Sequence, residues 1–238
     1  MPRLDILVTR SGLAESRERA QALIIAGKVR VAGETVRRPD RSVSDDAAIS
    51  VEEGPAYASR GALKLAPALI TFRVEPAGLV CADIGASTGG FTDVLLRRGA
   101  AKVYAIDVGR GLLHWRLRQD PRVVVIERVN AREMESFPEP VSLIVIDVSF
   151  IGLEKILPSM RRAAPGAEVI ALFKPQFQVG RSEVGKGGIV RDQGVIEAAL
   201  DGFRSWCLAN GYMVRAVAPS EVPGADGNQE IFLDLVPS

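Results

Sequence analysis

The sequence has 238 residues, of which 47% are hydrophobic and 25% are charged, a composition typical of globular proteins rather than disordered chains. Its two cysteines, Cys81 and Cys207, lie far apart and His114 is the single histidine, which excludes a disulfide framework and a Cys/His metal site. The start of the chain lacks the apolar core of a signal peptide, and no apolar run reaches the ~20 residues that cross a bilayer. We therefore expect a cytoplasmic protein with no metal and no membrane partner.

The formal net charge is only +1, but basic residues are concentrated in residues 1–41. There, Ser16 followed by RERAQALIIAG predicts a short helix that Ser16 caps and Gly27 ends. Arginines in the first turn of a helix oppose its dipole, so a nearby anion such as phosphate would stabilise them. By charge alone, a solvated surface explains these arginines equally well.

The elements around this helix favour the first explanation. LDILVTRSG has helical spacing, and KVRVAGETVRRPDRSVSDDAAISVEE alternates as a small sheet does. The stretch RLDILVTRSGLAESRERAQALIIAGKVRVAGETV resembles the S4-type RNA-binding domain. That resemblance implies phosphate contacts from Arg3, Arg10, Arg17, Arg19, Lys28 and Arg30.

A linker is predicted where small residues replace the alternation, in EEGPAYASRGALK. We place an S4-like domain at residues 1–58 and a second domain at residues 59–238. In this division residues 59–65 belong to the linker, which carries Lys64.

From residue 78 onward, short apolar runs such as LVCADIG, KVYAIDVG and LIVIDVSF alternate with helical segments. This order predicts an α/β fold with a doubly wound, mostly parallel sheet. Ligands of such folds bind at the carboxyl ends of the strands.

The first of these strands runs into the glycine-rich turn DIGASTGGF and then a helix, an arrangement in which a ligand can approach the backbone closely. Dinucleotide enzymes prefer G-x-G-x-x-G, whereas an acidic residue followed by G-x-x-x-G is more typical of S-adenosylmethionine enzymes. Asp107 ends the next strand and suits the ribose of either cofactor. A tight turn without a ligand remains the alternative for the glycines, as does a simple strand cap for Asn130. The expected cofactor contacts are Asp83, Gly85, Ala86, Ser87, Thr88, Gly89, Gly90, Phe91, Asp107, Val108, Asn130 and Asp147.

Charged residues follow the next two apolar strands: Asp147 after LIVI and Lys174 after VIALF. A salt bridge between neighbouring strands would explain this pair alone. Lys64 and Glu230 could return to the same edge, so that four charges of alternating sign meet. Methyl transfer to a sugar hydroxyl requires removal of a weakly acidic proton, and a partly buried lysine is a suitable base. We therefore predict Lys174 as the base, with the two acids holding the lysines and no metal.

At this point the sequence closely resembles the TlyA (hemolysin A) family, which joins an S4 domain to an FtsJ-like methyltransferase. The segments that carry the resemblance are SRGALKL, DIGASTGGFTDVLLRRGA, IDVGRGLLHWRLRQDPRV, ERVNAR, DVSFI, KPQF and GNQE. The resemblance implies a Rossmann-like fold with an antiparallel last strand, S-adenosyl-L-methionine as cofactor and a tetrad of Lys64, Asp147, Lys174 and Glu230. It also implies 2′-O-methylation of cytidine in ribosomal RNA, as free RNA or in ribosomal subunits. Gln178 departs from the family, where we expect glutamate.

Three alternatives remain. A non-enzymatic S4-type RNA-binding protein would have a degenerate second domain, and an NAD-dependent oxidoreductase would use the same glycine turn. The absence of an amphipathic segment argues against a pore-forming haemolysin. Phe150 and Phe177 could stack on a flipped base beside the basic loop of Arg181, Lys186 and Arg191, but we favour core positions for both aromatic residues. We assign no chemical role to His114 or Trp115.

Overall fold

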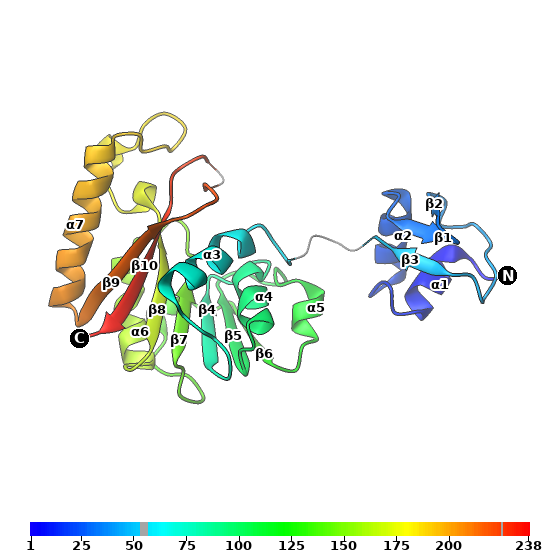
Figure 1. Ribbon diagram of the computed structural model, residues 1–238, viewed down its shortest axis with the longest axis horizontal. Coiled ribbons are helices and arrows are strands. Elements are labelled where there is room, and N and C mark those ends of the chain that lie inside the picture. The colour runs from blue at the N-terminus through cyan, green and yellow to red at the C-terminus, as the bar shows by residue number, and fades with distance from the viewer. Residues whose placement is uncertain (53–56, 225) are drawn as a thin grey trace. The chain divides into compact units, whose positions relative to one another are not determined.

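The computed structural model describes residues 1–52, 57–224 and 226–238. The chain forms two compact units, Met1–Ala56 and Tyr57–Ser238 (Figure 1). The division falls within the predicted linker, of which residues 53–56 lie outside the described residues.

The first unit packs two helices on a small sheet. Its helices are α1 (Leu4–Arg10) and α2 (Arg17–Ile25), and its strands are β1 (Val29–Val31), β2 (Glu34–Val36) and β3 (Ile49–Val51). The strands pair antiparallel in the order β2-β1-β3. Ser16 caps α2 as predicted, because its hydroxyl accepts a hydrogen bond from the Arg19 amide at 3.1 Å. The core of this unit is a small aliphatic cluster that includes Leu4, Leu7, Ile24 and Val29.

The second unit is built on a seven-stranded sheet of order β6-β5-β4-β7-β8-β10-β9. The strands are β4 (Val80–Ile84), β5 (Lys102–Asp107), β6 (Val123–Glu127), β7 (Leu143–Ile146), β8 (Glu168–Phe173), β9 (Tyr212–Pro219) and β10 (Ile231–Pro237). Pairing is parallel from β6 through β8, whereas β10 runs antiparallel to both of its neighbours. The predicted mostly parallel sheet with an antiparallel last strand is confirmed.

Helices cover both faces of this sheet, so the apolar residues form two layers (Figure 1). Helices α3 (Ala62–Phe72), α4 (Gly90–Arg97) and α5 (Trp115–Arg118) pack on one face, and α6 (Leu157–Ala163) and α7 (Gln193–Ala209) pack on the other. Short 3-10 turns, which the figure leaves unlabelled, are η1 (Ala131–Glu133), η2 (Leu153–Lys155), η3 (Pro175–Phe177) and η4 (Arg181–Glu183). No helix in the described parts of the chain has the length and apolar character to cross a bilayer.

The position of Lys64 corrects one prediction. Residues 59–65 are not wholly linker, because α3 begins at Ala62 and Lys64 lies in its first turn. The physical reason is burial: Ala62, Leu65 and Leu69 are fully buried in the layer beneath α3. Lys64 is therefore fixed on a packed helix and not on a flexible segment.

Candidate active site

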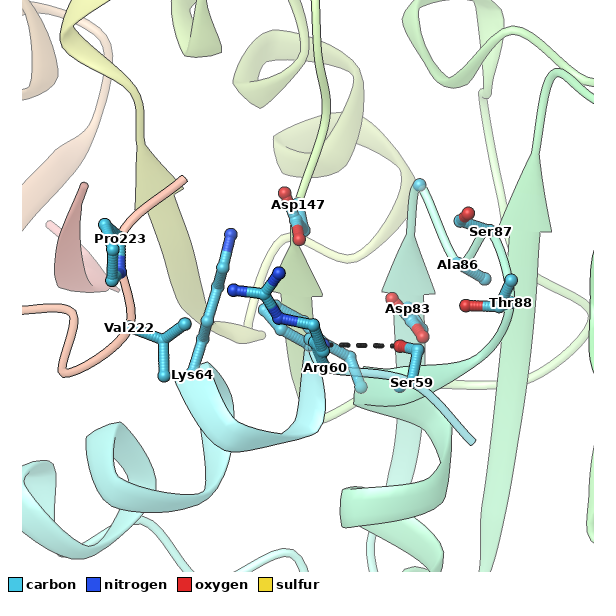
Figure 2. Close-up of a pocket in the computed structure, with 14 residues that line it drawn as sticks. Ser59, Arg60, Lys64, Asp83, Ala86, Ser87, Thr88, Asp147, Val222 and Pro223 are labelled. Atoms are coloured by element: carbon cyan, nitrogen blue, oxygen red, sulfur yellow. Dashed lines mark hydrogen bonds between the residues drawn. The ribbon is translucent and has the colours of Figure 1, made fainter. Parts of the chain in front are cut away.

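Two cavities adjoin at the carboxyl ends of β4, β5 and β7, where the order of the strands reverses around β4. The first cavity is lined by Lys64, Asp83, the glycine-rich turn and Asp147 (Figure 2). The second continues from it beneath Asp107 and Asn130. Asp147 lines both cavities, so it marks their junction.

The glycine-rich turn after β4 lies in close contact with its neighbours. Gly85 has φ +84°, and a Cβ added there would lie 2.4 Å from the main-chain oxygen of Asp147. A Cβ on Gly90 would lie 2.2 Å from the Ser59 hydroxyl oxygen. Glycine is needed at these positions because any side chain would force the turn away from β7 and α3.

Asp83, at the end of β4, is a buried carboxyl group with only one of its oxygens satisfied. Its Oδ2 accepts hydrogen bonds from the amide and the hydroxyl of Thr92, at 2.8 and 2.6 Å. Its Oδ1 has no hydrogen-bond partner among the residues that the structure describes. Burial raises the pKa of Asp83 to about 7, against the hydrogen bonds from Thr92. Because Asp83 lines the first cavity, this carboxyl is suited to a cationic group of a ligand.

Asp107 lies at the mouth of the second cavity, and backbone amides orient its carboxylate. Oδ2 accepts from the Ser87 amide and Oδ1 from the Gly109 amide, both at 2.7 Å. The neighbouring Val108 and Leu112 are 71% and 47% exposed and line the same cavity. A partly polar, partly apolar cavity of this kind suits an adenosine group.

Asn130 fits both explanations that the sequence left open. Its side-chain oxygen accepts from the Arg132 amide at 3.2 Å, so it caps η1. It also lines the second cavity. The local capping bond holds the amide group at the cavity wall.

The four charged residues of the predicted tetrad form two ion pairs. Lys174 Nζ lies 2.6 Å from Asp147 Oδ1 and donates to the Ser149 hydroxyl at 3.0 Å. Lys64 Nζ donates to Glu230 Oε2 at 2.5 Å.

These ion pairs have little access to solvent. The side chains of Lys174 and Glu230 are only 9% and 3% exposed, so their charges depend on each pair staying intact. In Figure 2, Lys64 extends from α3 into the cavity that Asp147 also lines. Each pair therefore places one of its members, Lys64 or Asp147, at the wall of one cavity.

The basic residues predicted to bind RNA fall into two groups. Arg3 and Arg17 donate to the buried Asp5 at 3.1 and 3.0 Å, and Arg10 pairs with Asp45. By contrast, the second group has side chains without a hydrogen bond or ion pair to any residue within the described ranges: Arg19, Lys28 and Arg30. The first group stabilises the unit, and the second remains available to an external anion.

Comparison with known proteins matches residues 57–235 to the FtsJ-like methyltransferase family and residues 2–49 to the S4 domain. The chain is 46% identical to the 16S/23S rRNA (cytidine-2′-O)-methyltransferase TlyA of Mycobacterium tuberculosis H37Rv, over 98% of this chain and 89% of the relative. The chain belongs to the TlyA family.

Other members of the TlyA family carry a different name. The chain is 42% identical to Hemolysin A of Brachyspira hyodysenteriae, over 98% of this chain and 99% of that protein. A solved structure from Streptococcus thermophilus, described as a hemolysin, has a TM-score of 0.75 and 40% identity and covers 99% of this chain and 88% of its own. Membership in the TlyA family makes the second unit an S-adenosylmethionine-dependent methyltransferase. The unpartnered oxygen of Asp83 and the amide-bound carboxylate of Asp107 fit this cofactor.

Gln178, at a position where we expected the glutamate of the family, contacts an acid. With its amide nitrogen toward Glu154, it donates to both carboxylate oxygens of Glu154 at 2.8 and 3.1 Å, and its oxygen accepts from the Leu153 amide at 3.0 Å. A glutamate there would place two carboxylates together. Glutamine suits this local environment because it can donate.

Sequence reasoning placed one aromatic residue wrongly and missed several residues that line the first cavity. Phe150 is 92% exposed with φ +66°, and its ring centroid lies 5.4 Å from that of the partly buried Phe177, so it is not a core residue. Its strand ends at Ile146, and the left-handed backbone then turns the side chain outward. Sequence reasoning did not single out four residues that line this cavity: Ser59, Arg60, Val222 and Pro223. Of the basic loop, Lys186 and Arg191 are exposed, and the side chain of Arg181 is outside the described residues.

Proposed function

We propose that this chain transfers a methyl group from S-adenosylmethionine to the 2′-hydroxyl of cytidine in ribosomal RNA. One observation carries the proposal: each of two shielded Lys–acid ion pairs places one charged residue, Lys64 or Asp147, at the wall of a cavity that adjoins the proposed cofactor cavity. The name of the Mycobacterium tuberculosis relative, 16S/23S rRNA (cytidine-2′-O)-methyltransferase, supports the choice of nucleotide and substrate.

In this proposal the second cavity would hold the adenosine of the cofactor, and the first would hold its methionine part. Val108, Leu112 and Asn130 would enclose the adenine, and Asp107 would accept hydrogen bonds from the ribose. Asp83 would hold the methionine ammonium with its free oxygen. The bound cofactor would supply an electrophilic methyl group beside Asp147.

In this proposal Lys174 acts as the neutral amine, after its ammonium has released a proton to solvent, and accepts the proton of the ribose hydroxyl while the hydroxyl oxygen would bond to the methyl carbon. The bond from that carbon to the cofactor sulfur would break at the same time, which would leave S-adenosylhomocysteine. The ammonium that results is stabilised by Asp147 at 2.6 Å and by the Ser149 hydroxyl at 3.0 Å. Lys64 donates to the same oxygen as negative charge develops on it, and Glu230 keeps Lys64 in position.

We assign RNA binding to basic side chains that no described residue pairs with and to an exposed aromatic residue. Arg19, Lys28 and Arg30 of the first unit would bind phosphates, which position an RNA without reading its sequence. Phe150, exposed beside the junction of the cavities, offers a surface on which an unstacked base can lie.

The test is to incubate the purified full-length chain with methyl-labelled S-adenosylmethionine and ribosomal RNA from cells that lack this protein. We expect label at the 2′-oxygen of cytidine, located by mapping ribose-methylated nucleotides. RNA binding without any methyl transfer would contradict the proposal and favour the non-enzymatic alternative. Calorimetric binding of NAD but not of S-adenosylmethionine would favour the oxidoreductase.

A further inference from the structure

Asn228 is a buried polar side chain outside the tetrad that joins two distant loops. It is 1% exposed, its Oδ1 accepts from the Val190 amide at 2.9 Å, and its Nδ2 donates to the Gly188 carbonyl at 2.8 Å. These partners precede it by 38 and 40 residues. A single amide group therefore ties the turn of residues 185–190 to the loop that contains Asn228, of which residues 220–224 and 226–230 are described.

Among the described residues, the turn of residues 185–190 is held by its own backbone and by the buried Val190 as well as by Asn228. It closes on itself, because the Gly185 amide donates to the Ile189 carbonyl at 3.0 Å and the Gly188 amide to the Gly185 carbonyl at 3.1 Å. Val190, which is 4% exposed, anchors its end in the unit. Its exposed side chains include Lys186, and the exposed Arg191 follows it, so the turn presents positive charge to solvent.

The other loop determines where the carboxylate of Glu230 lies. The Gly224 amide donates to the main-chain oxygen of Asn228 at 2.9 Å, and a Cβ on Gly224 would lie 2.7 Å from Glu230 Oε1. The Ser220 amide donates to the Glu230 carbonyl at 2.8 Å, so the loop returns beside this residue. Val222 and Pro223 from the same loop line the cavity with Lys64 (Figure 2).

We propose that Asn228 is a positioning residue that couples the basic turn to the Lys64–Glu230 pair. RNA phosphates on Lys186 and Arg191 would then be held at a fixed place relative to the carboxylate that orients Lys64. This inference rests on the proposed function, since ribosomal RNA is the ligand that the turn would meet. An asparagine suits this position, because its amide group can accept from the Val190 amide and donate to the Gly188 carbonyl at the same time.

The experiment compares four full-length variants with the wild type: Asn228→Ala, Glu230→Gln, the double variant and Asn210→Ala. Asn210 is the matched control, because its Nδ2 also donates to a main-chain carbonyl, that of Trp206 at 2.8 Å, at the end of α7. We expect Asn228→Ala to lower kcat about 10- to 100-fold and to weaken ribosomal RNA binding about 3-fold, with S-adenosylmethionine affinity unchanged. Asn210→Ala should match the wild type in all three.

Two readouts separate positioning from a general loss of structure. If Asn228 acts through Glu230, the double variant should be no slower than Glu230→Gln alone, whereas fully additive losses in kcat would overturn the proposal. Hydrogen exchange at the Val190 amide should be faster in Asn228→Ala and unchanged in Asn210→Ala. Faster exchange together with wild-type kcat and RNA affinity would also overturn it.

A second variant, Asn228→Ser, covers the case in which the alanine variant does not fold. Its hydroxyl can hydrogen-bond one of the two main-chain groups that Asn228 joins but not both, so we expect an intermediate loss of kcat. If the wild type methylates no ribosomal RNA, the proposed function fails by itself. The RNA dissociation constants and the exchange at Val190 then still decide whether Asn228 holds the turn.

Discussion

Asp5 of the first unit and Asp83 of the second are both completely buried, but their oxygens differ in how fully they are hydrogen-bonded. Asp5 of the first unit accepts from Arg3, Arg17 and Gln21, so both of its oxygens are satisfied. Burial alone would raise the pKa of Asp5, but the hydrogen bonds from Arg3, Gln21 and Arg17 hold it well below its usual range. Asp83 of the second unit has bonds only to Thr92, and burial raises its pKa to about 7. The carboxylate of Asp5 is therefore fully used within its unit, whereas Asp83 lines a cavity and has an oxygen left for a ligand.

The largest expected effect comes from Lys174→Ala, which tests whether the charged residues of the second unit take part in methyl transfer. Lys174→Ala should lower kcat for ribosomal RNA methylation by about 10²- to 10⁴-fold, because it removes the proposed base. Its affinity for RNA should stay near that of the wild type in a filter-binding assay. Lys102→Ala is the control, since Lys102 forms an ion pair with Glu139 at the opposite end of β5. A Lys174→Ala variant with more than a tenth of wild-type kcat would contradict the assignment.

The second effect tests the structural role of the saturated aspartate. Asp5→Ala should destabilise the first unit by about 2 kcal/mol, because Arg3, Arg17 and Gln21 lose their shared acceptor. Hydrogen exchange should accelerate in α1 and α2, and RNA affinity should fall. S-adenosylmethionine affinity, which we assign to the second unit, should not change. Equal exchange rates in variant and wild type would contradict a structural role for Asp5.

The third effect tests the unsaturated aspartate as a ligand group. Asp83→Asn should weaken S-adenosylmethionine binding about 10-fold at pH 8, because a neutral amide replaces the carboxylate that would pair with the ammonium. In the wild type, affinity should fall between pH 8 and pH 6 as Asp83 becomes protonated near its pKa of about 7. In the variant it should stay nearly flat. Calorimetry at both pH values measures this, and a parallel slope in the variant would exclude Asp83 as the titrating group.

The same substitution has a consequence for stability whose sign is fixed. The folded-state pKa of Asp83 lies above its ordinary value of 3.8, so the folded state binds more protons than the unfolded state between pH 4 and pH 7. Its contribution to stability is present at pH 4 and is lost as the pH rises through 7. Without cofactor, the melting temperature of Asp83→Asn relative to that of the wild type should therefore be higher at pH 8 than at pH 5.

The smallest effect concerns the arginines themselves. Arg19→Ala should weaken RNA binding about 3-fold and lower the salt dependence of binding by about one phosphate contact, without a change in stability. Arg204→Ala on α7, where Arg204 pairs only with Asp201, is the control. If Arg19→Ala leaves RNA binding intact while Arg3→Ala reduces it, the assignment of Arg19 to RNA binding and of Arg3 to the stability of the unit is wrong.

Sequence patterns predicted the elements better than the contacts between them. The Ser16 cap, the alternating strands and the glycine turn are local, so neighbouring residues are enough to define them. Asp147 and Lys174 were predicted to be partners because parallel strands end at one edge.

The rest depends on contacts between residues far apart in the sequence. The outward turn of Phe150 depends on its backbone at φ +66°, and Asn228 reaches partners 38 and 40 residues away. The glycine and alanine around Lys64 resemble a linker until the burial of Leu65 is known. Such features arise from packing, which periodicity does not encode.

The contact between Gly85 and Asp147 has a consequence for evolution. A Cβ at Gly85 would lie 2.4 Å from the Asp147 carbonyl oxygen, so main chain meets main chain where the two cavities adjoin. The spacing between the glycine-rich turn and the main chain of Asp147 is then set by the backbone and not by any rotamer. Side chains around the two cavities can therefore change while the turn and Asp147 keep their separation.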